Sequence, residues 1–430
     1  MTAVKPGLKE NLNQFILLVL VNSFVGGMVG LERSILPVIA QKTFQLEGNS
    51  LLLSFILVFG TAKAISNYFT GYLASIVGRK NLLVIGWLFA LPIPFLLMHT
   101  TSWQFIIVAN ILLGIQQGLC WSSTVIMKID LVGEKNRGLS MGLNEFAGYL
   151  SIALVAYLTS IIASYYGIRP YPFYIGLVLV ALGLFFSLIL IQDTKQLVAT
   201  EARHSDLPRL KNIFLDTTIR HKNLSSVTQA GLINNLNDGM AWGLFPILLV
   251  SKDFTLSQIG IITAIYPATW GLSQLYTGKL SDRICRKKLL FWGMLIQGLT
   301  ILCFPVMDSF LGFMLLSLAL GWGTALVYPT FMVAISEETH PIDRAKSLGV
   351  FRFWRDLGYA IGALITGYCA DAFGIPFAIS LTGVLTIGSA LFLHKRMTCH
   401  QLINKKSFFQ RGFIEKNNHD GLPYSGIKIQ

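Results

Sequence analysis

The chain contains two related copies of the segment Gly71-Tyr-Leu-Ala-Ser-Ile-Val-Gly-Arg-Lys-Asn-Leu-Leu-Val-Ile-Gly-Trp-Leu88. The second copy is Gly278-Lys-Leu-Ser-Asp-Arg-Ile-Cys-Arg-Lys-Lys-Leu-Leu-Phe-Trp-Gly-Met-Leu295. It lies 207 residues further on, and eight of its eighteen positions are identical to the first. The same offset relates Arg137 to Arg344, Ser140 to Ser347, Gly142 to Gly349, and Phe146 to Phe353. A constant offset of this reach indicates two copies of one structural unit.

The composition is that of a membrane protein. Of the 430 residues, 53% are hydrophobic and only 13% are charged, whereas soluble domains carry about 25% charged residues. Many apolar runs approach the roughly 20 residues that cross a bilayer. The net charge of +13 sits in short loops between apolar runs, so we expect no nucleic-acid partner.

The apolar runs predict an all-α membrane protein of twelve transmembrane helices arranged as two six-helix pseudo-repeats. The predicted spans are residues 14–38, 51–74, 81–99, 103–127, 138–164, 171–192, 226–250, 257–280, 288–306, 309–335, 345–370 and 375–395. This divides the chain into an N-terminal bundle (1–192), a cytoplasmic linker (193–224), a C-terminal bundle (225–397) and a cytoplasmic tail (398–430).

The positions of Lys and Arg orient these spans. With both termini inside, 27 of the 34 fall on the cytoplasmic side, and only Lys42, Arg169 and Lys252 fall outside. Because cytoplasmic loops are enriched in Lys and Arg, we expect a multi-pass protein of the cell membrane, of the bacterial inner-membrane type, with both termini cytoplasmic. Each half then begins and ends on that side, which predicts parallel repeats.

The duplicated loops resemble those of the major facilitator superfamily, whose loop pattern is G-x-L-a-D-r-x-G-r-k. The first copy matches it at Gly71, Leu73, Gly78, Arg79 and Lys80, and the second at Gly278, Leu280, Asp282, Arg283, Arg286 and Lys287. The resemblance covers about residues 10–397 and implies the twelve-helix fold of that superfamily and transport by alternating access. The first copy has Ser75 where the pattern has aspartate.

The motif residues are candidates for a gate. Glycine lets two helices approach closely, and an aspartate at a helix end can pair with basic groups or with a neighbouring helix terminus. We therefore assign gating to Gly71, Arg79, Gly278, Asp282 and Arg283, and expect Ser75 to form no charged latch. The alternative is that the basic loop residues only hold the orientation of the chain.

Two carboxylates within the spans are candidates for proton coupling. An ionisable side chain inside a span costs roughly 2.5–3.5 kcal/mol on insertion scales, so each one is a functional candidate. Asp238 lies in Asn234-Asn-Leu-Asn-Asp-Gly239, a polar stretch of span 7, and Glu32 lies in the outer half of span 1. A structural ion pair is the alternative for both, and for Asp238 the partner considered is Lys63.

Other polar residues within the spans are candidates for substrate binding and for a second part of the gate. The substrate-binding candidates are Arg33, Lys63, Gln116, Gln117, Asn235, Asn237 and Arg355. The additional gating candidates are Glu145, Arg352 and Asp356. Glu145 and Arg352 are related by the 207-residue offset, so they are expected to meet across the two halves. Arg352 and Asp356 are one helical turn apart and are expected to pair, which leaves Arg355 with spare donors.

The charges predicted within the spans balance, four acidic against four basic, which favours neither a strongly anionic nor a strongly cationic substrate. The sequence has no GxxxxGK[ST] loop and no motif of a membrane enzyme or a metal site. We therefore expect no enzymatic activity and no cofactor, with a proton gradient as the energy source.

The leading functional prediction is a secondary active transporter of a small molecule, monomeric and surrounded by lipid. The compact twelve spans and short central loop resemble drug-efflux members of the superfamily, which favours export by proton antiport. Proton-coupled uptake of a siderophore, metal chelate or organic anion is the alternative. A sensor or assembly factor that kept the fold without transport is the alternative of a different class.

Overall fold

The structure is a computed structural model that describes residues 7–33, 35, 36, 39, 43–45, 54–132, 136–202, 207–254 and 256–399. Residues 1–397 form one compact unit. The tail predicted over 398–430 lies outside the described residues from 400 onward, and so do Lys42 and the side chain of Arg33. Every element within the described ranges is a helix, which confirms the all-α prediction.

The helices of the first half follow the predicted spans closely. They are α1 (Leu12–Arg33), α4 (Ser54–Ile76), α5 (Arg79–Ala90), α6 (Pro92–His99), α7 (Trp103–Val132), α8 (Arg137–Tyr166), η2 (Tyr171–Phe173), α9 (Tyr174–Phe185) and η3 (Phe186–Leu190). Helices α5 and α6 together form the third span. Pro92 starts α6 because proline suits a first helical turn, where a backbone N–H is not needed.

The second half repeats this order after a linker. The linker contains α10 (Lys195–Ala202), α11 (Ile213–Leu215) and η4 (Asp216–Arg220). The helices that follow are α12 (Lys222–Ser251), α13 (Leu256–Ser281), α14 (Arg286–Cys303), η5 (Phe304–Val306), α15 (Phe310–Glu337), α16 (Pro341–Phe373) and α17 (Ile375–Arg396).

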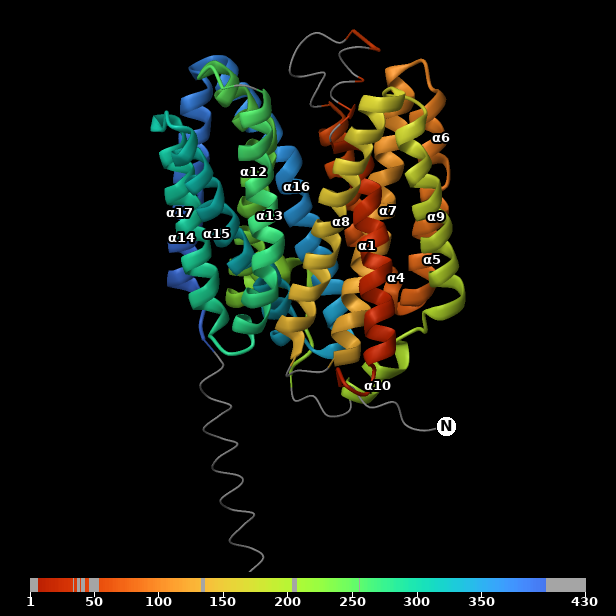
Figure 1. The fold of residues 1–430 in the computed structure, drawn as a ribbon. Coiled ribbons are helices and arrows are strands. Elements are labelled where there is room, and N and C mark those ends of the chain that lie inside the picture. Colours follow the sequence, from red (N-terminus) through yellow and green to blue (C-terminus); the bar gives the residue numbers. More distant parts are fainter. Residues whose placement is uncertain are drawn as a thin grey trace, which may run out of the picture. The chain divides into compact units, whose positions relative to one another are not determined.

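Packing within the two halves follows the sequence repeat. Helix α1 packs on α8 and α4 on α7; their equivalents α12 and α16, and α13 and α15, pack in the same way. Figure 1 shows the helices of the first half, red to yellow, beside those of the second half, green to blue. One buried apolar cluster lies mainly in the first half, and another, around Trp270 and Phe313, lies in the second.

Polarity separates the helices into two groups. Within the described ranges, eight helical stretches are long and apolar enough to cross a membrane, and they include α1, α7, α8 and α15. Helices α4, α12, α13 and α16 are equally long but are not among them. Three of these four, α4, α13 and α16, contact the other half. Polar residues therefore concentrate where the two halves meet.

One departure from the predicted spans is at α7. The fourth span was predicted to end at residue 127, but α7 continues to Val132. Lys128 was counted as a loop residue, and this was wrong, because it lies in the helix with none of its surface exposed. Asp130 in the same turn is also buried. The structure thus adds buried charges that the sequence reading left out.

Among the described residues, two helix pairs make the main contacts between the halves, α4 with α16 and α8 with α13, and α8 also contacts α15. The linker helix α10 contacts both α7 and α16, and α11 contacts α16. We call the end of the helices next to this linker the linker side; α4 and α13 end there, and α8 and α16 begin there. In Figure 1 it is the lower end, where α10 is labelled.

Candidate functional site

The α4–α16 pair is closed by two glycines near the linker side. A Cβ atom placed on Gly71 would lie 2.8 Å from the Cα of Gly349 and 2.6 Å from the carbonyl oxygen of Ala345. A Cβ on Gly349 would lie 2.9 Å from the carbonyl oxygen of Asn67. Only glycine permits this approach of the two backbones. We call this contact the first seam.

The α8–α13 pair forms a second seam of the same design. A Cβ on Gly278 would lie 2.8 Å from the Cα of Gly142 and 2.7 Å from the carbonyl oxygen of Gly138. A Cβ on Gly142 would lie 2.4 Å from the carbonyl oxygen of Gln274. The glycines of both motif copies therefore contact the opposite half.

Asp282 adds a polar contact to the second seam only. Its carboxylate accepts hydrogen bonds from the backbone N–H groups of Gly138 at 2.7 Å and Leu139 at 2.9 Å. These groups belong to the first turn of α8, where the helix dipole favours a negative charge. The equivalent Ser75 instead donates to the carbonyl oxygen of Tyr72 in its own helix, at 2.9 Å. The two copies of the motif are therefore unequal in structure as well as in sequence.

The motif arginines brace each half internally. Arg79 lies 3.3 Å from Asp130 of α7, and both side chains are buried. The equivalent Arg286 lies 2.7 Å from Glu337 of α15. Arg283, in contrast, is exposed. Arg79 therefore holds its loop to α7 within the first half, and the second-seam contact is made by Asp282 and the N-terminus of α8.

The linker covers the first seam. The ring of Phe214 lies 5.9 Å from that of Tyr68 on α4 and 6.4 Å from that of Trp354 on α16. Arg209 donates two hydrogen bonds of 2.7 Å to Asp343 in the first turn of α16. The linker is thus attached to both helices of this seam.

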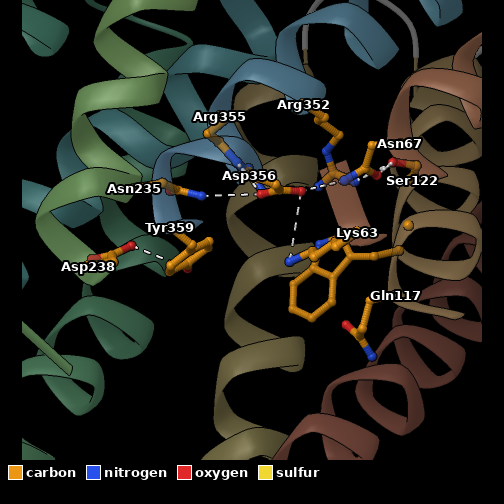
Figure 2. A network of polar contacts seen from close by, with 12 residues as sticks. Lys63, Asn67, Gln117, Ser122, Asn235, Asp238, Arg352, Arg355, Asp356 and Tyr359 are labelled. Carbon is orange, nitrogen blue, oxygen red and sulfur yellow. Dashed lines mark hydrogen bonds and ion pairs between the residues drawn. The ribbon is translucent and has the colours of Figure 1, made fainter. Parts of the chain in front are cut away.

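A polar network crosses the halves on the side of the first seam away from the linker. Asp356 of α16 accepts hydrogen bonds from Asn67 of α4 and from Asn235 of α12, the latter at 3.2 Å. Arg355 donates to the same carboxylate at 2.8 and 3.1 Å, and the Nζ of Lys63 lies 4.0 Å from it. Figure 2 shows Asp356 between Asn235 on one side and Asn67 and Lys63 on the other.

The network continues into α7 and α8. Arg352 donates to the hydroxyl of Ser122 at 2.7 Å, and Ser122 donates to Asn67. Glu145 of α8 accepts from the indole of Trp121 at 3.1 Å and from the amide of Asn144 at 2.6 Å. The ammonium of Lys128 donates to the side-chain oxygen of Asn144. All of these charged groups are buried.

Two of the predicted pairings were wrong. Asp356 takes its hydrogen bonds from the adjacent Arg355 rather than from Arg352 one turn away. Glu145 and Arg352 bond to different partners, so the gate pair expected across the halves is not formed in this conformation. The spare donors are mainly on Arg352, whose Nε and Nη2 have no hydrogen-bond partner, and one, Nη1, remains on Arg355.

Aromatic rings lie beside the network. The ring of Tyr149 lies 4.0 Å from that of Trp270 across the second seam, and its hydroxyl lies 3.0 Å from that of Tyr328. The guanidinium of Arg355 lies 4.7 Å from the ring centre of Tyr328. The ammonium of Lys63 lies 5.7 Å from the ring centre of Trp121. The charged groups thus have π faces on both halves as neighbours.

Asp238 lies apart from this network, within the second half. The hydroxyl of Tyr266 on α13 donates to one carboxylate oxygen, and that of Tyr359 on α16 lies 3.4 Å from the other. Tyr266 also contacts the hydroxyl of Thr324 on α15 at 3.3 Å. The suggested pair of Asp238 with Lys63 was wrong, because Lys63 pairs with Asp356.

Glu32 lies in the first half beside a small cavity of about 20 Å³, lined also by Val29, Phe55, Ile56, Phe59, Asn110 and Leu113. Such a volume holds about one water molecule. Glu32 is 3% exposed. It is therefore a buried carboxylate in a mainly apolar setting, separate from both Asp238 and the central network.

The remaining substrate candidates divide between the two halves. Gln117 donates to the carbonyl oxygen of Val25 and to Gln116, each at 2.7 Å, and the amide nitrogen of Gln116 has no partner. Asn237 is turned into the second half, where Gln297 and Thr386 bond to it at 3.2 and 2.7 Å. Asn235 reaches the network and Asn237 does not. Within the described ranges, no group of three or more His, Cys, Asp or Glu could hold a metal ion.

The family follows from a comparison along the whole chain. A family model described as Major Facilitator Superfamily matches residues 16–225 and 227–411. The chain belongs to this superfamily. It is therefore related to transporters built from two bundles of six helices, as the duplicated loops indicated.

Relatives of known name are distant. The proton-coupled antiporter flippase LtaA of Staphylococcus haemolyticus is 22% identical over 399 residues, covering 90% of this chain and 93% of that protein. The inner membrane transport protein YnfM of Escherichia coli K12 is 29% identical over 152 residues, which cover 35% of this chain and 36% of YnfM.

Solved structures agree in fold. The human organic anion transporter MFSD10 superposes with a TM-score of 0.71 at 16% identity, covering 88% of this chain and 99% of that one. The proton:xylose symporter XylE superposes with a TM-score of 0.69 at 16% identity, covering 90% of this chain and 96% of that one. At this identity the likeness shows the fold alone.

Several residues of the site escaped the sequence analysis. Asn67, Ser122, Asn144 and Tyr266 are uncharged and common in membrane helices, so nothing in the sequence distinguished them. For Lys128 the sequence repeat held a clue. The 207-residue offset makes Asp130, two residues further on, equivalent to Glu337 of α15. An acidic residue at both equivalent positions indicates that the helices of the fourth and tenth spans continue to Asp130 and Glu337.

Proposed function

We propose that this protein is a secondary active transporter that moves a small solute by alternating access, with protons as the coupling ion. The observation that carries the proposal is that α4 and α16 bear both the closed first seam and the polar network that joins the halves. Lys63 is eight residues from Gly71 along α4, about 12 Å at the helical rise. When the seam opens, the contacts of Asp356 with Asn67 and Lys63 must change with it.

The linker side is the cytoplasmic side in this proposal. The bias of Lys and Arg toward that side supports the assignment. Both seams lie near the linker side, so the conformation described here is the one closed to the cytoplasm. A solute would then reach the network from outside, and release to the cytoplasm requires the two glycine contacts to separate.

Asp238 is the proposed proton carrier. Its carboxylate is buried and faces two tyrosine hydroxyls. Tyr266 contacts α15 through Thr324, and Tyr359 lies on α16 one turn from Asp356. A change in the ionisation of Asp238 therefore alters hydrogen bonds on the same helix that holds the network. Glu32 is the second candidate, because it lies in an apolar cavity of the first half.

Export by proton antiport is the favoured direction. The name of the relative LtaA, a proton-coupled antiporter flippase, supports antiport, and its similarity extends over 90% of this chain. Uptake by proton symport is the second candidate, and the proton:xylose symporter XylE, which has the same fold, supports it. Both directions require the same opening and closing of the two seams.

The proposal is tested in proteoliposomes that contain a pH-sensitive dye. A panel of neutral, anionic and cationic solutes is added on one side, and we expect at least one to drive proton movement. Asp238→Asn should abolish this proton movement while leaving downhill solute exchange. The double variant Asn237→Asp with Asp238→Asn serves as a position control. It moves the carboxylate one residue along α12 and should not restore proton movement. Absence of solute flux with the whole panel would favour a sensor or assembly factor instead.

A further inference from the structure

The central network carries more positive than negative charge. Its cations are Lys63, Lys128, Arg352 and Arg355, and its anions are Glu145 and Asp356. The sequence count was balanced because it included Glu32 and Asp238, which lie elsewhere, and left out Lys128; it also included Arg33, whose side chain is outside the described part of the structure. Among the described side chains, four cationic residues against two acidic ones give a formal excess of two positive charges in a buried setting, where unpaired charge is costly.

Unused donors of the two arginines belong to this cluster. The Nε and Nη2 atoms of Arg352 and the Nη1 atom of Arg355 are buried and make no hydrogen bond. The two guanidinium groups are three residues apart on one face of α16. Guanidinium forks match the oxygens of phosphate and carboxylate groups in a way that a neutral or cationic group cannot.

We propose that Arg352 and Arg355, with Lys63, bind the oxyanion of the transported solute, a phosphate or carboxylate group on an organic molecule. This inference rests on the proposed transport function and adds the substrate class. An oxyanion would offset the excess positive charge and accept from the three unused guanidinium donors. The ring of Trp121 lies beside Lys63 and that of Tyr328 beside Arg355, and Tyr149 packs against both rings. These rings offer apolar faces to the organic part.

The two acidic groups of the network do not use up the hydrogen-bond donors of its arginines. Asp356 is already held by Asn67, Asn235 and Arg355, and Glu145 by Trp121 and Asn144. Neither carboxylate bonds to Arg352. The bound oxyanion would therefore add a partner to Arg352 without displacing an existing ion pair. It would also lie at the level where both halves contribute, as alternating access requires.

Binding to the purified protein in nanodiscs tests the inference without any transport assay. The probes are phenyl phosphate and benzoate, with benzyl alcohol and benzylamine as uncharged and cationic counterparts of similar size. Quenching of intrinsic tryptophan fluorescence reports binding, because Trp121 is part of the network. We expect one or both oxyanions to bind and the two counterparts to bind at least about tenfold more weakly, since one charge-assisted contact is worth about that much. The ratio of the two oxyanions separates phosphate from carboxylate as the preferred group.

Variants assign the binding to the proposed atoms. Arg352→Gln should raise the Kd of the oxyanion at least about tenfold, and Arg352→Lys, which keeps the charge but loses the fork, should give an intermediate value. Arg169→Gln is the matched control, because Arg169 lies outside the network and donates to the carbonyl oxygen of Thr100. Its Kd should equal that of the wild type.

The outcomes separate this inference from the transport proposal. Oxyanion binding that Arg352→Gln weakens supports the inference even if no proton movement is detected in proteoliposomes. Binding of benzylamine or benzyl alcohol in preference to both oxyanions overturns it, and proton-coupled transport of such a solute would leave the proposed function intact. Equal oxyanion binding by the wild type and both Arg352 variants, or none by the wild type, overturns it as well.

Discussion

Gly71 of α4 contacts Gly349 of α16, and their equivalents in the repeat, Gly278 and Gly142, contact each other in the same way. In each pair the would-be Cβ of the motif glycine lies 2.8 Å from the Cα of its partner. Each motif glycine meets a helix of the opposite half. Gly71 of the first half meets α16, and Gly278 of the second half meets α8. Duplication therefore produced two seams from one glycine contact, and both lie at the linker side.

A side chain at this contact should force the first seam apart. Gly71→Leu would overlap Ala345 and Gly349, and overpacking of this kind costs about 1–3 kcal/mol. We expect the closed conformation to lose population, seen as a longer distance between nitroxide labels at Ile76 and Ile342, which are exposed on α4 and α16. Gly367→Leu is the matched control, since a Cβ there meets nothing within 4 Å. An unchanged distance in Gly71→Leu would contradict the seam.

The polar contact of Asp282 should stabilise the second seam alone. Asp282→Asn loses one of two hydrogen bonds to the first turn of α8, because an amide nitrogen cannot accept one, unlike the oxygens of an ionised or protonated carboxyl group. Since the side chain is half-buried, we expect a cost of about 1 kcal/mol, or about fivefold in the closed-to-open ratio. Labels at Asn136 and Lys279 would report this opening. Ser75→Ala removes only a hydrogen bond within α4, so it should leave both seams closed. An equal effect of the two substitutions would contradict the asymmetry.

Closure of the second seam should depend on pH through the same carboxyl. Burial raises the pKa of Asp282 above its ordinary value, while the N–H groups of Leu139 and Gly138 and the charge of Arg286 act in the opposite direction. Opening returns the carboxyl to water, so the closed state binds the proton more tightly. Closure is then favoured as the pH falls through the raised pKa, and the gain is complete below the ordinary value.

The measurement is the distance between labels at Asn136 and Lys279 over a pH series. The closed fraction should rise on acidification in the wild type and should be flatter in Asp282→Asn, which cannot ionise. A wild-type closed fraction that falls on acidification would show that the hydrogen bonds to α8 outweigh burial.

The sequence predicted the helices well because apolar length and the placement of basic residues are local properties. The ends of the spans agree with the helices to within a few residues at most positions, and the 207-residue repeat already singled out Gly71, Gly142, Gly278 and Gly349. It could not show that these glycines meet, because that depends on which helices of the two halves are neighbours.

Lys128 was misplaced for a similar reason. A basic residue after an apolar run resembles the end of a span, and only the position of α8 shows that Asn144 receives it.

The partners of the buried charges were beyond the sequence. Arg352, Arg355 and Asp356 were correctly expected on one helix face, but which arginine reaches the carboxylate depends on side-chain rotamers and on neighbours from other helices. Ser122 of α7 accepts from Arg352, which leaves Asp356 to Arg355. The excess positive charge of the network follows from these choices, and so it became visible only in the structure.

Removal of one tyrosine hydroxyl should change proton coupling at Asp238. Tyr266→Phe takes away a donor to the carboxylate, and because one hydrogen bond is worth about 1 kcal/mol, the rate of solute-driven proton movement should fall about fivefold. Tyr359→Phe is the comparison, because its hydroxyl lies 3.4 Å from the carboxylate and forms the weaker bond. We expect a smaller change there. The measurement is the rate of solute-driven proton movement in proteoliposomes, and a larger effect of Tyr359→Phe would contradict the assignment.

The linker should replace, at the first seam, the latch that Ser75 lacks. Phe214 packs between Tyr68 and Trp354, and an aromatic contact of this kind is worth about 0.5–1.5 kcal/mol. Phe214→Ala should therefore lengthen the distance between labels at Ile76 and Ile342 and leave that between Asn136 and Lys279 unchanged. Asp282→Asn should show the opposite pattern. If each seam is stabilised by its own contact, the double variant Phe214→Ala with Asp282→Asn should open both seams. The two free-energy costs should add, because the two sites share no partner. Strong coupling between them would instead mean that the halves move as one rigid gate.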